Sequence, residues 1–455
     1  MTAVAPAELV ERIWARDATL WTGADEAKWL GWLDEPMRMR SRLEELQRFA
    51  EDIAAPGVID TVVLLGMGGS SLAPYVLKKT FEAGGFHVLD TTHPAMIRHA
   101  TETLDLDATL FVVSSKSGTT LETRSHLDYF WKKAGRRGEF FVAITDPGSE
   151  LQTLARERRF LRVFDGEPTI GGRYSALSVF GVVPAALMGI DLGRLLERVE
   201  EMVEACRVVQ GNPGLELGLD LGAGWQEGRD KVTINPDTGD FGLWAEQLLA
   251  ESTGKDGRGL VPAPGESRDG PDRQAPEVRL PAPYELGQEF FRWEFATAVA
   301  GSILGINPFD QPNVQAAKDR TNEVLEAGGD PDVEPKGDLD ELLAQARPGD
   351  YVAIQAFIDP MREAELGPLL ERARKTGCVV THGLGPRYLH STGQLHKGGP
   401  NTGLFVQVVD DPGDEIAIPG RKFGFRRLIR AQAAGDLSSL EERGRRIVRV
   451  RLEDL

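Results

Sequence analysis

The chain has 455 residues, 41% of them hydrophobic, which is enough for two domains that each bury a core of their own. Its 70 acidic and 52 basic residues give a net charge of −18, which argues against binding to nucleic acid or to an anionic membrane. The two cysteines, Cys206 and Cys378, are too far apart in the sequence for a metal or redox motif, so we expect buried thiols in a reducing compartment.

The first 58 residues predict an N-terminal helical segment, because apolar residues such as Leu9, Ile13, Leu46 and Phe49 recur at helical spacing among charged ones. They contain no basic stretch followed by an apolar run, as a signal peptide would, and the later apolar stretches are too short to span a bilayer. We therefore expect a cytoplasmic protein.

Two series of short apolar segments predict strands that alternate with helices, which is the pattern of parallel sheets with helical crossovers. The first series comprises residues 61–65, 87–89, 110–113, 140–144 and 160–164, and the second 231–234, 351–357, 378–382, 403–409 and 447–451. Residues 263–283 and 328–349 are rich in Pro, Gly and acidic side chains and predict loops. The predicted fold class is α/β, with a helical segment at 1–58, a first domain at 59–205 and a second at 206–455.

A glycine-rich turn, from Gly66 to Ser71, follows the first predicted strand and precedes a predicted helix. Bare backbone at such a turn lets an anionic ligand approach closely. A dinucleotide site is one alternative, because Asp90 ends the next strand, but Ser71 replaces the third glycine of that motif. A tight turn without a ligand is the other alternative.

A second loop is dense in hydroxyl groups: six of the ten residues from Ser114 to Thr123 are Ser or Thr, and the loop opens a predicted helix. Free amides, the positive helix end and several hydroxyl donors together suit a phosphate group. The alternative is a capping box between Thr119 and Glu122, which would need only one or two of these hydroxyls.

Three further segments contain candidate catalytic groups, although each residue type alone is more often a solvated surface charge. Arg173 follows a pair of glycines, and its rigid, permanent cation suits a developing oxyanion. Gln247 and Glu251 share one face of a predicted helix that ends at Gly254, and Glu251 could serve as a general base near neutral pH.

The last segment begins at a Pro-punctuated turn, 309–313, and starts a predicted helix. Gln311 and Lys318 are seven residues apart, which is two helical turns on one face, so both side chains could reach the same pocket.

Taken together and in this order, these segments resemble phosphoglucose isomerases from about residue 60 to residue 318. The stretch from Gly385 through Asn401 is similar to the isomerase half of bacterial transaldolase/phosphoglucose isomerase fusions. The sequence contains no barrel domain that would carry the transaldolase lysine, so we expect no transaldolase activity.

The resemblance implies two sugar-isomerase domains, each a mostly parallel sheet flanked by helices, in a homodimer with active sites near the subunit interface. It implies an enzyme of glycolysis and gluconeogenesis that interconverts glucose 6-phosphate and fructose 6-phosphate by proton transfer through an enediolate. No cofactor, metal, nucleic acid or membrane would take part.

The resemblance also implies residue roles. Glu251 would be the base, Arg173 would stabilise the enediolate, and Gln247, Gln311 and Lys318 would contact the sugar. The phosphate would be held by Ser115, Lys116, Ser117, Thr120 and Thr123, with Gly69 and Ser70 lining the sugar site.

Two features depart from the family pattern. Asn313 stands where the family usually has Gly, and Gln315 where it usually has Glu. The chain also has no histidine between His126 and His382, where bacterial relatives carry the histidine that opens the sugar ring.

Our hypothesis is that His390 or His396, from the same or the partner subunit, opens the ring, because histidine is the commonest acid–base group near neutral pH. Lys318 is the competing candidate, and two loop histidines without a catalytic role are the alternative.

Three other functions compete with this reading. A dual phosphoglucose and phosphomannose isomerase has a similar phosphate loop and would turn over mannose 6-phosphate. A non-catalytic sugar-phosphate sensor would not need Glu251, Arg173 and Lys318 together. A nicotinamide oxidoreductase would bind the cofactor, and we expect no such binding.

Overall fold

The computed structural model describes residues 4–55, 57 and 59–455, with the side chains of residues 314–318 outside that description. Its N-terminal segment contains the helices α1 (Pro6–Trp14), α2 (Glu35–Ser41) and α3 (Leu43–Ile53), joined by short 3₁₀ turns. Leu9, Ile13, Leu46 and Phe49 are all buried, as their helical spacing predicts. The predicted helical segment is therefore confirmed for the described residues.

The first sheet has the order β2-β1-β3-β4-β5, and all its strands are parallel. The strands are β1 (Thr61–Leu65), β2 (Phe86–Leu89), β3 (Thr109–Ser114), β4 (Phe141–Thr145) and β5 (Arg162–Asp165). The helices around them are α4 (Leu72–Thr80), α5 (Pro94–Thr103), α6 (Leu121–Lys133), α7 (Glu150–Glu157) and α8 (Val179–Leu187).

This sheet is buried on both faces, which explains its continuous apolar strands. Along β1, Val62 and Leu64 belong to one hydrophobic cluster, while Val63 and Leu65 belong to another on the opposite face. The first predicted strand series is confirmed, with each strand within two residues of its expected bounds.

The second half of the chain contains two hydrogen-bonded parallel sheets instead of one. A three-stranded sheet has the order β7-β6-β8, and a four-stranded sheet has the order β10-β9-β11-β12. The strands are β6 (Lys231–Ile234), β7 (Val261–Pro264), β8 (Arg273–Gln274), β9 (Tyr351–Phe357), β10 (Val379–Leu384), β11 (Gly403–Val409) and β12 (Arg446–Arg451). β7 lies beside β10, so the two sheets adjoin.

Nine α-helices follow α8 in the described part of the chain. They are α9 (Leu192–Ala205), α10 (Pro213–Gln226), α11 (Phe241–Thr253), α12 (Glu285–Leu304), α13 (Val314–Ala327), α14 (Leu339–Leu343), α15 (Gly367–Arg374), α16 (Gly393–Gly398) and α17 (Phe425–Glu442). Two loop predictions are wrong in part, because β8 lies within 263–283 and α14 lies within 328–349.

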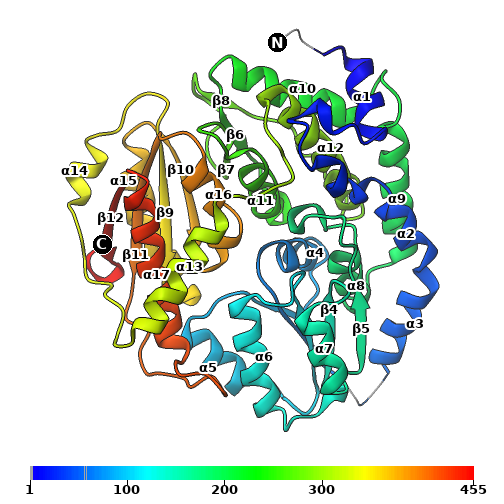
Figure 1. Cartoon of the computed structure of the whole chain (residues 1–455), viewed down its shortest axis with the longest axis vertical. Helices are drawn as coiled ribbons and strands as arrows, with labels where there is room; N and C mark the ends of the chain where they lie inside the picture. Colours follow the sequence, from blue (N-terminus) through cyan, green and yellow to red (C-terminus); the bar gives the residue numbers. More distant parts are fainter. Residues whose placement is uncertain (1–3, 56, 58) are drawn as a thin grey trace.

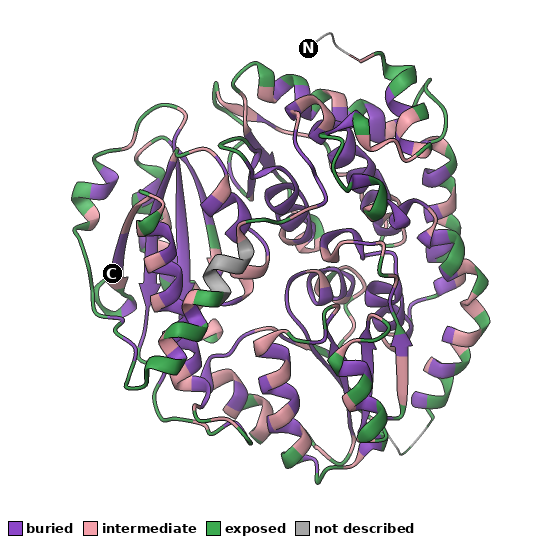
Figure 2. Cartoon of the chain, in the orientation of Figure 1, coloured by how far each residue is buried: buried purple, intermediate pink, exposed green. Residues whose placement is uncertain are grey.

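Figure 1 shows the four-stranded sheet on one side of the molecule and the N-terminal helices along the opposite side, with α4 and α11 between them. Exposed residues gather on the outer turns of the helices, whereas the strands and the inner helices are buried (Figure 2). None of the helices in the described part is long and apolar enough to cross a bilayer. The predicted class, α/β with parallel sheets flanked by helices, is confirmed.

Candidate active site

One cavity of ≈ 460 Å³ collects most of the predicted site residues, and its volume is typical of a site for a small molecule. From the predicted set it is lined by Gly69, Ser70, Lys116, Ser117, Thr120, Arg173, Gln247, Glu251, Gln311 and His390. Ser115 and Thr123 are buried and do not line it, and the side chain of Lys318 lies outside the described residues. Segments far apart in the sequence therefore converge on one cavity.

The glycine-rich turn after β1 allows three chain segments to meet at this cavity. Gly68 has a φ of +53°, and a Cβ there would lie 2.5 Å from the carbonyl oxygen of His390. A Cβ at Gly69 would lie 2.1 Å from the carbonyl oxygen of Gly172. Glycine is needed at both positions, because a side chain would push apart the turns that carry Arg173 and His390.

The hydroxyl-rich loop after β3 opens into the same cavity at the N-terminus of α6. Ser117 and Thr120 line the cavity, and the buried Ser115 hydroxyl donates to the Thr120 Oγ1 at 3.0 Å. Thr120 is the N-cap residue of α6, and its side chain makes no capping bond. The alternative of a capping box between Thr119 and Glu122 is therefore wrong, and the hydroxyls and the helix N-terminus suit an anion.

Lys116, in the same loop, is held by an acidic neighbour. Its Nζ lies 2.7 Å from both carboxylate oxygens of Asp146 and donates to the carbonyl oxygen of Glu167 at 2.7 Å. Burial lowers the pKa of Lys116 and raises that of Asp146, and the ion pair opposes both shifts. Both side chains border the cavity, so Lys116 brings a charge that Asp146 already balances.

The candidate base and the candidate cation form a buried pair that also lines the cavity. Glu251 lies in the last turn of α11, which ends at Gly254 as predicted, and its Oε1 is 3.3 Å from the Nη1 of Arg173. Gln247, one turn earlier, donates from its Nε2 to the Glu251 Oε2 at 2.9 Å and to the carbonyl oxygen of His390 at 2.9 Å. Both carboxylate oxygens therefore have a partner that fixes their position.

Arg173 is 1% exposed and has neutral partners besides the carboxylate. Its Nε donates to the Ser252 Oγ at 2.7 Å, and its Nη2 donates to the carbonyl oxygens of Pro308 at 2.7 Å and of Asp310 at 2.9 Å. This fork of donors fixes the guanidinium at the cavity wall, as the planar geometry of arginine permits.

Gln311, in the middle of the 309–313 turn, lines the cavity. Asn313, which replaces the usual glycine of the family, has a φ of −97° and therefore needs no glycine-specific backbone. Gln315 lies among the residues whose side chains are not described.

His390 borders the cavity from within the same chain and is oriented by a carboxylate that the sequence analysis did not assign to the site. Its Nε2 lies 3.0 Å from the Glu122 Oε1, which also accepts from the Gln432 Nε2 at 2.6 Å. A carboxylate of this kind fixes the ring orientation and the tautomer of its histidine. The other candidate, His396, is buried, contacts Gln355 at 3.0 Å and does not line the cavity of its own chain.

Several cavity residues were missed from the sequence. Asp146 directly follows β4, so its place at the carboxyl end of a parallel strand could have flagged it. Asp25 and Trp29 come from the irregular N-terminal segment and carry no local signal. In the described part of the chain, no group of three or more His, Cys, Asp or Glu side chains could hold a metal ion, and the two cysteines are free and buried.

The family model for phosphoglucose isomerase matches residues 35–209. The glucose-6-phosphate isomerase of Gloeothece citriformis is 36% identical over 211 residues, which is 43% of this chain and 40% of that protein. The enzyme of the same name from Thermus thermophilus is 39% identical over 189 residues, or 40% of this chain and 45% of that protein. The chain thus spans less than half the length of these curated relatives.

Two solved structures share the fold. A glucose-6-phosphate isomerase from Chlamydia trachomatis superposes with a TM-score of 0.54 and 21% identity, over 70% of this chain and 78% of that one. A hypothetical protein from Thermus thermophilus superposes with a TM-score of 0.51 and 22% identity, over 98% of this chain and 83% of that one. The resemblance to phosphoglucose isomerases is confirmed, with the family model matching residues 35–209, whereas the similarity of the 385–401 stretch to the fusion proteins stays a prediction.

Proposed function

We propose that the chain is an aldose–ketose isomerase that interconverts glucose 6-phosphate and fructose 6-phosphate. The observation that carries the proposal is that one cavity holds a buried carboxylate paired with an arginine, Glu251 and Arg173, together with the hydroxyl-rich loop of Ser117 and Thr120. This arrangement suits a substrate with a reactive carbonyl at one end and a phosphate at the other. Relatives named glucose-6-phosphate isomerase support the same substrate.

The mechanism that fits these groups is proton transfer within the open-chain sugar. The Glu251 carboxylate removes the proton from C2 of glucose 6-phosphate and returns it to C1, while a proton moves from O2 to O1. The Arg173 guanidinium stabilises the negative charge of the intervening enediolate, because it is fixed by three other acceptors and needs no reorganisation. Gln247 orients the base, and Gln311 contacts the sugar hydroxyls.

The phosphate would be anchored at the opposite end by Ser117, Thr120 and the N-terminus of α6, with the buried Ser115 supporting Thr120. The buried Thr123 would support the phosphate loop from its inner side, and Lys116 would contribute to phosphate binding together with its ion-pair partner, Asp146. Gly69 and Ser70 would let the sugar approach the backbone.

Ring opening needs a second acid–base group, and His390 is the group we assign to it. Its ring borders the cavity, and Glu122 would steady the imidazole as it exchanges a proton with the ring oxygen. Lys318 remains a candidate for a sugar contact or for this step.

The proposal includes further expectations that follow from the resemblance. The chain would form a homodimer in the cytoplasm, with domains at 59–205 and 206–455 behind the helical segment 1–58, and would use no cofactor.

A coupled assay tests the proposal: the purified chain is incubated with fructose 6-phosphate, and glucose 6-phosphate is measured with its dehydrogenase. Formation of glucose 6-phosphate is expected, and no conversion at micromolar enzyme would refute the function. Mannose 6-phosphate in a parallel reaction separates a phosphoglucose isomerase from a dual isomerase, which would convert both.

A further inference from the structure

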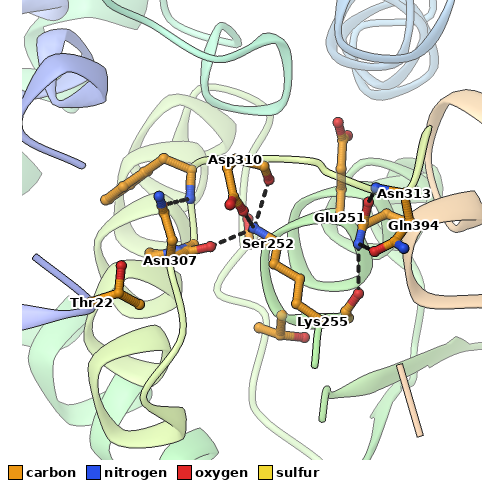
Figure 3. A network of polar contacts seen from close by, with 12 residues as sticks. Thr22, Glu251, Ser252, Lys255, Asn307, Asp310, Asn313 and Gln394 are labelled. Atoms are coloured by element: carbon orange, nitrogen blue, oxygen red, sulfur yellow. Dashed lines mark hydrogen bonds and ion pairs between the residues drawn. The ribbon is translucent and has the colours of Figure 1, made fainter. Parts of the chain in front are cut away.

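Lys255 lies two residues beyond the end of α11, four positions after the candidate base, and the function proposed above leaves it without a role. Its side chain is 2% exposed and does not point to Glu251. Figure 3 shows it reaching instead toward the segment from Asn307 to Asp310. Its Nζ donates to the carbonyl oxygen of Asn307 and lies 2.6 Å from both the carbonyl oxygen and the Oδ1 of Asp310.

The backbone of the 307–310 segment accepts hydrogen bonds from two cations, Lys255 and Arg173. The carbonyl oxygen of Asp310 accepts from Lys255 at 2.6 Å and from the Arg173 Nη2 at 2.9 Å, and Arg173 also takes the neighbouring carbonyl of Pro308. The next residue, Gln311, lines the cavity together with Asp310. The position of the sugar-facing turn and that of the guanidinium therefore depend on each other.

This segment and the residues that follow it are also linked to other parts of the site. The Asn307 Nδ2 donates to the Oδ1 of Asp25, another cavity residue, at 3.1 Å. On the far side, Gln394 donates to the carbonyl oxygen of Gly254 at 2.9 Å and accepts from the backbone N–H of Asn313 at 2.9 Å (Figure 3). The residues that follow α11 are therefore connected to the chain on both sides of Gln311: through Lys255 to Asp310, and through Gln394 to Asn313.

The charge of Lys255 is not favoured at this place. Burial lowers the pKa of Lys255 to about 7, the nearby Arg173 contributes to the same shift, and Asp310 and Glu251 oppose it. A buried ammonium next to another cation gives little net stability, even when it is paired. The three hydrogen bonds of the Lys255 ammonium instead fix the positions of its acceptors, which all belong to Asn307 and Asp310.

We propose that Lys255 is a positioning residue of the active site: it fixes the 307–310 segment so that Gln311 and Arg173 face the bound sugar phosphate. The inference rests on the proposed function for the identity of the ligand. Lys255 does not line the cavity and takes no part in the chemistry.

The test compares Lys255→Met with Lys231→Met. Lys231 is a matched control, because it is also fully buried and its Nζ bonds a carboxylate, Asp230, and a backbone carbonyl, that of Gly349, away from the cavity. The dissociation constant for fructose 6-phosphate is measured by calorimetry, alongside kcat and KM.

We expect Lys255→Met to raise the dissociation constant and KM at least tenfold, since a misplacement of positioning groups by about 1 Å can cost about a hundredfold. Lys231→Met should leave both constants unchanged while it also lowers resistance to denaturant. A purely structural role would lower stability in both variants and change binding in neither, and unchanged binding by Lys255→Met overturns the inference.

Three further outcomes are decisive. If Lys255→Met does not fold, Asp310→Asn removes the ion pair at a half-exposed partner, and an unchanged dissociation constant in that variant overturns the inference. If the wild type binds fructose 6-phosphate but does not convert it, the proposed isomerase is refuted, whereas the effect of Lys255 on binding still supports or overturns its positioning role. A wild type that does not bind the sugar phosphate refutes both.

Discussion

Replacing the candidate base with its amide, Glu251→Gln, changes one atom of the site and removes the group that moves the proton. The Gln247 Nε2 can still donate to the new carboxamide oxygen, which takes the place of the carboxylate oxygen now at 2.9 Å. The contact with the Arg173 Nη1 at 3.3 Å is lost as an ion pair, but Arg173 keeps its bonds to Ser252, Pro308 and Asp310. The shape of the cavity should therefore be preserved.

The expected consequences differ in size. Loss of a positioned general base costs about 10²–10⁴ in rate, so kcat should fall at least a hundredfold. The lost ion pair should lower the free energy of unfolding by about 1–3 kcal/mol, because the remaining neutral partners of Arg173 still accept its hydrogen bonds. KM should change little, since Ser117, Thr120 and Gln311 remain in place.

The assay is the conversion of fructose 6-phosphate by wild type, Glu251→Gln and a matched control, Glu246→Gln. Glu246 lies on the same helix and is also buried, but it does not line the cavity, so its variant should keep wild-type kcat. A Glu251→Gln protein that folds and retains more than a tenth of wild-type kcat would refute the assignment of the base.

Three other predictions concern the phosphate loop, the histidine and pH. Thr120→Val should raise KM for the sugar phosphate about tenfold or more and leave kcat nearly unchanged, because it removes a hydroxyl of the phosphate site; equal KM values in steady-state kinetics would contradict this. His390→Ala, and more weakly Glu122→Gln, should slow turnover of cyclic substrate while open-chain substrate is isomerised normally, and equal loss on both forms would exclude a ring-opening role. Burial raises the pKa of Glu246 to about 7 from 4.5, so the stability that comes with its proton is present at pH 4.5 and is lost as the pH rises through 7. The free energy of unfolding of Glu246→Gln, measured with urea, should therefore rise relative to that of the wild type by about 3 kcal/mol between pH 5 and pH 8. A difference between the two proteins that does not change with pH would contradict the raised pKa of Glu246.

Much of the fold follows from local sequence patterns. The strands of the first sheet are runs of apolar and often β-branched residues that end in glycine or polar turns, and burial on both faces makes those runs continuous. β7 was missed because its sequence contains Pro262 and Pro264, which normally disfavour a strand. The structure accommodates them because β7 is at the edge of its hydrogen-bonded sheet.

β8 and α14 escaped prediction for another reason: they are only two and five residues long, too short to show a period. The N-cap of α14, Asp338, accepts from the backbone N–H of Glu341, but this signal is hidden in an acidic run. Short elements of this kind are determined by tertiary packing.

The site could be predicted where a residue type, its turn and its helix face act locally, as for Glu251 with Gln247 and for the loop that ends at Thr120. Long-range partners could not be predicted. Glu122 fits a helix cap in the sequence, yet it contacts His390 across a separation of 268 residues. Lys116 fits a phosphate ligand, yet Asp146, which comes after the next strand, binds its ammonium.

The central claim is that this chain moves a proton between C2 and C1 of a hexose phosphate. The most direct test incubates the pure chain with fructose 6-phosphate in deuterated water and follows the products by NMR. We expect glucose 6-phosphate that carries deuterium at C2 and fructose 6-phosphate that gains deuterium at C1, with both signals lost in Glu251→Gln. Unlabelled fructose 6-phosphate after prolonged incubation with the wild type would contradict it.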